Sequence, residues 1–160
     1  MTLAQISNIV GATMAARIRR VIGLYDRIPY SLIALIARLF TGLVFHLSWR
    51  TKIDFDSWTI KPATFFLFAN EYKVPLIPPN LAAYLATTAE LLCPLLLWAG
   101  LASRFAATAL LGMVLVIQTF VYPGAFMDHA LWSIGLLTIM RFGPGKISLD
   151  HWLGRLHVRH

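Results

Sequence analysis

Ionisable side chains inside apolar segments are the residues of this sequence that could do chemistry. Glu90 lies near the middle of residues 80–100, NLAAYLATTAELLCPLLLWAG, and Arg38 interrupts the apolar residues 31–49. An ionised group deep in a bilayer is costly, so it must find a partner, stay protonated or face a wet cavity. We therefore predict that Arg38 and Glu90 pair between two helices, either to fix helix register or to line a proton or ligand pocket.

A second polar group is expected where other apolar segments end or begin. His46 and Gln118 each lie about one turn from the end of an apolar segment, and His129 and Trp132 lie in the first turns of another. Imidazole titrates near neutral pH, so His46 and His129 are candidate proton carriers; the alternative for each is an interfacial side chain bonded to water or backbone. The candidate site comprises Glu90, Arg38, His46 and His129 as catalytic residues and Gln118, Trp132, Lys52, Tyr122 and Trp49 as cofactor-binding residues.

Metal and flavin chemistry have no motif in this sequence. Two histidines can ligate a metal, but there is no HxxxH word and no Cys/His spacing, so we predict no metal site. The single cysteine, Cys93, excludes an internal disulfide and a CxxC relay.

The composition places the chain in a membrane. Hydrophobic residues make up 58% and charged residues 13%, and the mean hydropathy is +0.69. The net charge of +7 could suggest nucleic acid, but the basic residues flank apolar segments and form no stripe on a soluble face. We therefore expect the lipid bilayer, and not nucleic acid, as the partner of this surface.

Four apolar segments must position the polar groups. Because only helices or closed barrels satisfy the backbone in lipid, and no strand-like alternation appears, we predict an all-α integral membrane four-helix bundle over residues 30–143. The spans are expected at about residues 31–49, 80–100, 103–121 and 126–142. Twenty residues of helix rise about 30 Å, close to the thickness of the hydrocarbon core.

Three further segments complete the expected organisation. Residues 1–29 carry apolar side chains at helical spacing and a cluster of arginines, which predicts an amphipathic helix on an anionic leaflet; the alternative is a disordered basic tail. The loop at residues 54–79 is expected to hold a short aromatic helix from Pro62 through Tyr72, lying across one mouth of the bundle or serving only as an aromatic anchor. Residues 144–160 form a basic tail.

The distribution of Lys and Arg predicts the orientation. Two sets of basic residues fall on opposite sides: Arg17, Arg19, Arg20, Arg27, Arg104, Arg141, Lys146, Arg155 and Arg159 on one, and Arg50, Lys52, Lys61 and Lys73 on the other. The positive-inside rule then predicts a multi-pass protein of the cell inner membrane with both termini cytoplasmic.

The arrangement of these residues resembles the DoxX family of small four-helix membrane proteins. The resemblance rests on Arg38, Gly42 and Phe45, on Lys52, and on the motifs AE (residues 89–90), GLASR (100–104) and GPGKISLD (143–150). The words EYKVPLIPP (71–79) and VYP (121–123), with His129 and Trp132, are similar to a branch associated with copper handling.

The resemblance implies a subunit or accessory of a membrane redox system. The leading expectation is a bundle that binds a hydrophobic redox carrier, a quinone, as the membrane subunit of a quinone-linked oxidoreductase or of an oxidant- or metal-defence system. The alternatives are a non-catalytic docking or assembly subunit for a redox or copper-handling partner and, less favoured, a small-solute transporter. Each hypothesis of a redox role predicts a protein partner. A homodimer, in which small residues let two helices approach closely, is a further possibility.

Overall fold

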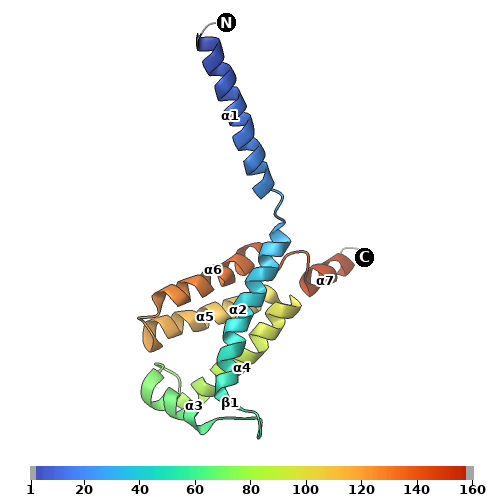
Figure 1. The fold of residues 1–160 in the computed structure, drawn as a ribbon. Helices are drawn as coiled ribbons and strands as arrows, with labels where there is room; N and C mark the ends of the chain where they lie inside the picture. Colours follow the sequence, from blue (N-terminus) through green and yellow to red (C-terminus); the bar gives the residue numbers. More distant parts are fainter. Residues whose placement is uncertain (1–2, 158–160) are drawn as a thin grey trace.

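The computed structural model describes the backbone of residues 3–157 and the side chains of residues 14–156. In chain order the elements are α1 (Leu3–Tyr25), α2 (Tyr30–Lys52), β1 (Ile53–Asp54), β2 (Thr59–Ile60), α3 (Pro62–Leu67), the π-helical turn η1 (Phe68–Tyr72), α4 (Pro79–Ala99), α5 (Ser103–Val116), the π-helical turn η2 (Ile117–Val121), α6 (Phe126–Phe142) and α7 (Leu149–His157). Figure 1 shows their arrangement.

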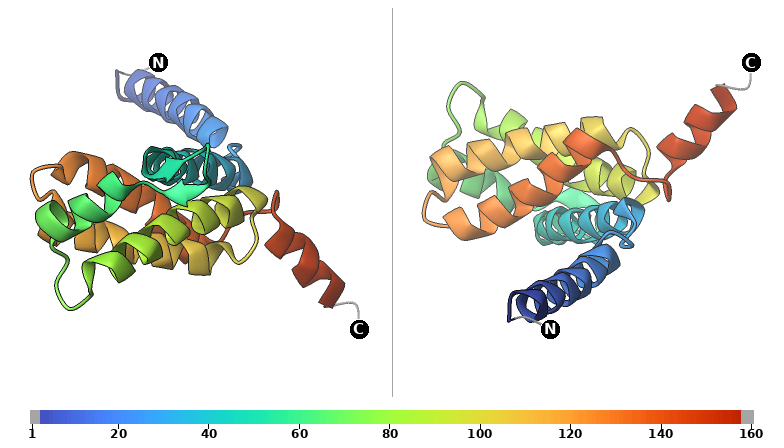
Figure 2. Two further views of the ribbon diagram at one scale, coloured as in Figure 1. Left: turned by 90° about the horizontal axis from the view of Figure 1, so that it is seen from below. Right: turned by 90° about the horizontal axis from the view of Figure 1, so that it is seen from above.

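The predicted all-α membrane fold is confirmed in its coarse form. Three helices of the described chain are long and apolar enough to cross a membrane: α2, α4 and the continuous segment of α5 and η2. Helix α6 has 17 residues and lies beside α5, to which it is joined by a short connection (Figure 2). Although α6 is short, it belongs to the packed unit, because it contributes Leu136 and Ile139 to the core.

Four helices pack around one another. Helix α2 contacts α4 and α6, and α5 contacts the same two helices, which closes a ring around an apolar core. The buried core residues are Phe45, Cys93, Leu97, Ala106, Ala107, Leu110, Val114, Leu136 and Ile139. Ala106 and Ala107 are fully buried, and side chains of this size let neighbouring helices approach closely.

The two ends of this packed unit differ. We call the end that holds the C-terminus of α2 and the N-termini of α4 and α6 the loop end, and the opposite end the tail end. The long loop after α2 lies at the loop end and contains a small antiparallel ladder that we did not predict, with Ile53 opposite Ile60 and Asp54 opposite Thr59. The Asp54 carboxylate accepts hydrogen bonds from the Ser57 hydroxyl and the Asp56 amide, and these bonds hold the pKa of Asp54 below its ordinary value.

A loop after α6 fastens the tail end. The Tyr30 hydroxyl donates to the Gly143 carbonyl at 2.5 Å, and the Lys146 amide donates to the Ser31 hydroxyl at 3.0 Å. The Arg38 guanidinium donates to the carbonyls of Leu97, at 3.3 Å, and Ile147. Residues 143–148 are therefore tied to the start of α2 and the end of α4, which gives the GPGKIS part of the motif a structural role.

Asp150 provides the N-terminal cap of α5 from a distant part of the chain. Its two carboxylate oxygens accept hydrogen bonds from the amides of Ala102, at 2.7 Å, and Ser103, at 3.0 Å. Its own amide donates to the Gly100 carbonyl at 2.8 Å. A carboxylate here satisfies free amides and complements the helix dipole.

Replacing Asp150 with alanine is therefore expected to destabilise the protein by about 1–2 kcal/mol, because two amides at the start of α5 lose their acceptor. Asp150→Asn should lose less, since the amide oxygen still accepts one hydrogen bond. Chemical denaturation in detergent measures both. An alanine variant as stable as the parent would show that water replaces the carboxylate at no cost.

Helices α1 and α7 leave the packed unit from the tail end (Figure 1). In α1 the exposed apolar side chains Met14, Ile18, Val21 and Ile22 recur at helical spacing. The predicted helix of the N-terminal arm is thus present over Leu3–Tyr25, while its placement on a leaflet stays a prediction. The side chains of Ile6 and Val10 lie outside the described residues.

Candidate ligand pocket at the loop end

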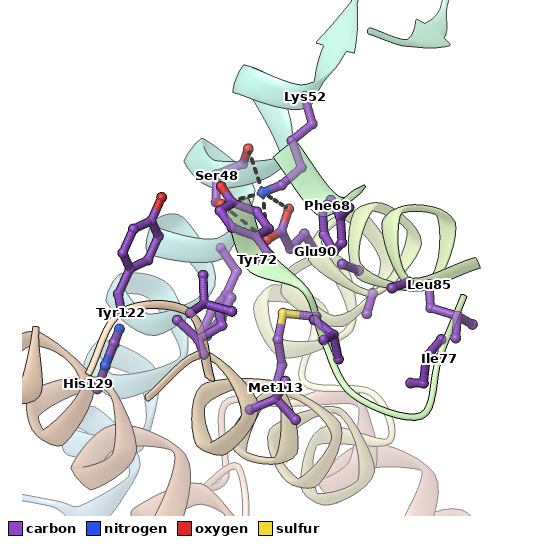
Figure 3. A pocket seen from close by; sticks show the side chains of 18 of the residues that line it. Ser48, Lys52, Phe68, Tyr72, Ile77, Leu85, Glu90, Met113, Tyr122 and His129 are labelled. Carbon is purple, nitrogen blue, oxygen red and sulfur yellow. Dashed lines mark hydrogen bonds and ion pairs between the residues drawn. The ribbon is translucent and has the colours of Figure 1, made fainter. Parts of the chain in front are cut away.

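A cavity of about 460 Å³ opens among the helices at the loop end (Figure 3). Its volume lies in the range of small-molecule binding pockets. The lining residues come from α2, η1, the segment after η1, α4, α5, η2 and α6: Val44, Phe45, Ser48, Lys52, Phe68, Tyr72, Val74, Ile77, Ala82, Leu85, Ala86, Ala89, Glu90, Met113, Val116, Ile117, Val121, Tyr122, His129 and Trp132. Most are apolar, so the few polar groups among them are the specific features of the pocket.

A buried ion pair forms one wall. The Glu90 side chain is only 4% exposed, and its carboxylate oxygens lie 2.7 and 2.9 Å from the Lys52 ammonium. The Ser48 hydroxyl donates to Glu90 at 3.1 Å and accepts from Lys52 at 2.8 Å. Ser48 and Lys52 are four residues apart in α2, so both face α4. Each charged atom of the pair has its hydrogen-bonding partners, which is the condition for keeping such a pair in an apolar site.

A histidine held by an amide forms the opposite wall. His129 Nδ1 lies 2.6 Å from Gln118 Oε1, and the Gln118 amide nitrogen donates to the Pro123 carbonyl at 2.8 Å. Because Gln118 presents its oxygen, Nδ1 is the donor, and in the neutral ring Nε2 carries the lone pair. The Trp132 ring packs edge-on against His129 at 5.1 Å and against Phe45 at 5.9 Å. These contacts fix the orientation of the His129 ring.

Aromatic residues also line the pocket. The Tyr72 ring packs edge-on against Phe68, at 5.0 Å, and against Tyr122, at 5.7 Å, joining the loop after α2 to the end of η2. Burial raises the pKa of the Tyr72 hydroxyl above its ordinary value, and Tyr122, Glu71 and Glu90 raise it further. Tyr72 is therefore a neutral phenol that can donate a hydrogen bond. Tyr72 is the last residue of the π-helical turn η1, and Tyr122 directly follows the π-helical turn η2; such turns are frequent at functional sites.

The structure brings together most of the candidate site residues, but not all. Glu90, Lys52, Tyr122, His129 and Trp132 line the cavity, and Gln118 supports His129 from behind.

His46 and Trp49 are not among the lining residues. Their rings stack at 5.2 Å, and His46 also packs against Trp98 at 5.1 Å. Their α-helical positions place them away from the pocket, since Ser48 and Lys52 define the face of α2 that lines it.

The predicted pairing of Arg38 with Glu90 is wrong. Arg38 is 1% exposed at the tail end, where it bonds the carbonyls of Leu97 and Ile147, while Glu90 is held by Lys52 and Ser48. Leu97 and Glu90 are seven residues apart in α4, or about 10 Å along the helix axis. Counting residues from the helix ends underestimated this offset between α2 and α4.

Ser48, whose hydroxyl donates to Glu90, was not among the residues predicted for the pocket. Its spacing of four from Lys52 is the signal that could have found it. The apolar lining, including Ala86, Ala89 and Met113, carried no distinguishing signal, because small and flexible side chains are common throughout the spans.

One comparison with known proteins gives a match. A family model described as DoxX matches residues 33–123, more than half of the chain. The matched region contains Ser48, Lys52, Tyr72, Glu90 and Tyr122, whereas His129 and Trp132 lie beyond it. The comparisons with curated proteins and with solved structures give no match.

Proposed function

Because this chain belongs to the DoxX family, a family of membrane proteins, we propose that it spans the inner membrane four times and binds a quinone-type hydrophobic carrier at the loop end. The observation that carries the proposal is the cavity of about 460 Å³, apolar over most of its wall and bearing an ion pair, a histidine and two phenols. A quinone has the matching chemistry, since it combines an apolar ring and tail with two oxygens that accept hydrogen bonds.

Four spans require α6 to cross the membrane as well. Its 17 residues rise about 25 Å, which is short but compatible with local thinning or interfacial anchoring. An even number of crossings agrees with the departure of α1 and α7 from the same end (Figure 1). The excess of basic residues at that end then makes both termini cytoplasmic and opens the pocket towards the outer side.

The pocket residues have distinct roles in this proposal. Tyr72 and Tyr122 donate hydrogen bonds to the carrier's carbonyl oxygens. His129, whose Nε2 carries the lone pair, and Glu90 accept protons when the reduced carrier releases them. The carrier supplies the redox chemistry, and a partner protein exchanges the electrons with it, so the chain serves as the membrane subunit of a quinone-linked system.

Quenching of tryptophan fluorescence tests the proposal, because Trp132 lines the pocket and quinones quench indole emission on contact. Purified protein in detergent should bind a short-chain quinone saturably. Ala86→Phe, which fills the pocket, should abolish saturable quenching, whereas Ala109→Phe, which adds the same ring to the exposed face of α5, should preserve it. His129→Ala should weaken binding of the corresponding quinol, measured by competition with the quinone, about fivefold, because the hydrogen bond that Nε2 accepts from a quinol hydroxyl is lost. Folded parent protein that shows no saturable quenching would refute quinone binding.

A docking subunit is the second candidate, and the projecting helix α1 is the observation that favours it (Figure 1). Its exposed apolar side chains, such as Ile18 and Ile22, contact no other part of the described chain closely enough to be buried. A partner that co-purifies with the parent and with Glu90→Gln, but not with a variant carrying Ile18→Asn and Ile22→Asn, would support docking through α1.

A further inference from the structure

A second cavity lies at the tail end, remote from the proposed quinone pocket. Its volume is about 950 Å³, and it is lined by residues from the start of α2, the start of α5, the end of α6, the following loop and the start of α7. The lining residues are Pro29, Tyr30, Ser31, Ala102, Arg104, Phe105, Phe142, Gly143, Pro144, Gly145, Lys146, Asp150 and His151. The proposed function makes no use of this cavity.

The cavity carries an excess of positive charge. Among the residues that the structure describes, Arg104 and Lys146 form no ion pair, since the one pair found there joins Lys52 and Glu90. Asp150 also lines the cavity, but both of its oxygens accept hydrogen bonds from the amides of Ala102 and Ser103. Its carboxylate is thus hydrogen-bonded to the start of α5 and forms an ion pair with neither cation, and the two cations outnumber the one carboxylate in the cavity.

The backbone at Gly143 leaves room for Arg104, one of these two cations. A β-carbon added to Gly143 would lie 3.3 Å from Arg104 Nη2, so the absence of a side chain lets the guanidinium lie against the loop. Gly143 also has φ +83°, a conformation that favours glycine. In addition, His151 Nε2 is buried and makes no hydrogen bond within the described chain. The cavity therefore offers two cations, Arg104 and Lys146, to a ligand.

Lipid-facing apolar groups surround the cavity. Phe105 and Phe142, both lining residues, are 74% and 62% exposed on helices that pack in the membrane domain. Helix α7 begins beside the cavity and exposes Leu149, Trp152, Leu153 and Leu156, which recur at i, i+3, i+4 and i+7. This stripe is the pattern of a helix lying in the plane of a membrane interface. The cationic cavity is thus at the level of lipid headgroups, with apolar rings towards the acyl chains.

We propose that this cavity binds the headgroup of an anionic phospholipid, with Arg104 and Lys146 contacting the phosphate and Phe105 and Phe142 contacting the acyl chains. A basic pocket between membrane helices on the more positive side is suited to such a headgroup, because the adjacent leaflet is rich in anionic lipid. Arg104 suits a phosphate particularly well, since the planar guanidinium can donate two parallel hydrogen bonds. The bound lipid would also cover the junction of α2, α5, α6 and α7.

Native mass spectrometry of the full chain in detergent tests the proposal with phosphatidylglycerol and phosphatidylcholine of identical acyl chains. The parent should prefer phosphatidylglycerol by about 30-fold, as two cations near the headgroup provide. The double variant Arg104→Gln with Lys146→Gln should lose that preference. The matched control, Arg141→Gln with Arg155→Gln, removes the same charge from the same end but from residues that do not line the cavity, and should keep it. The charge-conserving variant Arg104→Lys with Lys146→Arg should retain most of it.

Three results would overturn the proposal. Equal binding of the two lipids by the parent would remove the headgroup preference, and equal losses in the double variant and its control would show a diffuse surface charge. Displacement of phosphatidylglycerol by inorganic phosphate at the same concentration would show a site for a free anion. Melting temperatures of all variants identify any that fail to fold; if the double variant fails, the single variants Arg104→Gln and Lys146→Gln test the site, because each should lose part of the preference.

Discussion

Replacing Lys52 with methionine is expected to destabilise the protein by about 3–5 kcal/mol, because it leaves the Glu90 carboxylate buried without its cation. The two side chains are 13% and 4% exposed and lie 2.7 Å apart. Glu90→Gln should cost less than the Lys52 variant, since Lys52 ends α2 and its ammonium can reach water. The double variant Lys52→Met with Glu90→Gln should recover most of the loss, because no uncompensated charge remains.

A double-mutant cycle by chemical denaturation in detergent measures this coupling. Lys73→Met provides the control, since Lys73 is exposed in the same loop, and it should change stability by less than about 0.5 kcal/mol. Additive losses in the two single variants would show that Lys52 and Glu90 do not act as a pair. Quinone quenching of the double variant then separates a purely structural pair from one that contacts the carrier.

Replacing Arg38 with methionine should have an effect of similar size, about 3–5 kcal/mol, at the opposite end of the molecule. Arg38 is buried, and its guanidinium donates to the carbonyls of Leu97 and Ile147; the Ile147 carbonyl would lose this donor, while the Leu97 carbonyl would keep only the bond from the Gly100 amide. Arg38→Lys should restore only part of the loss, because one ammonium replaces a planar group that spans two acceptors. Arg155→Met, an exposed arginine on α7, is the control and should be nearly neutral.

Hydrogen exchange distinguishes a local loss of the Arg38 hydrogen bonds at the tail end from a general loss of packing. In Arg38→Met the backbone amides around Lys146 and Asp150 should exchange faster than those of α5, because the loop after α6 loses its tie to α2 and α4. Faster amide exchange to the same degree along the whole chain would contradict this local role of Arg38. Quinone binding should survive in folded Arg38 variants, since Arg38 does not line the pocket.

Hydrophobic patterning was sufficient to predict the helices. The segments expected at 31–49, 80–100, 103–121 and 126–142 coincide with helices α2, α4, α5 with η2, and α6; the first three of these helices are long and apolar enough to cross a membrane, and a crossing by α6 stays a prediction. This agreement has a physical basis: in lipid the backbone must satisfy its own hydrogen bonds, so a long apolar segment has almost no alternative to a helix. The β1–β2 ladder was missed, because two residues per strand leave no periodic signal.

The cation that pairs with the buried Glu90 could not be predicted from the sequence. Glu90 was expected to need a cation, which the structure provides, but the cation is Lys52 and not Arg38. Both lie on α2, so choosing between them requires the axial offset and rotation of α4 against α2. Those two quantities depend on how the side chains of α2 and α4, such as Phe45 and Leu97, pack in the core, and not on hydropathy.

The amino-acid sequence by itself determined that this chain is an all-α membrane protein and that burial of the ionised side chains of Glu90 and Arg38 costs free energy. It also indicated that polar residues gather near one end of the helices. Only the tertiary structure decided that Glu90 belongs with Lys52, Ser48 and the pocket, that His46 and Trp49 turn away from it, and that Arg38 latches the tail end. The physical reason is that burial cost is a property of one segment, whereas the contact that offsets it depends on how two helices are placed against each other.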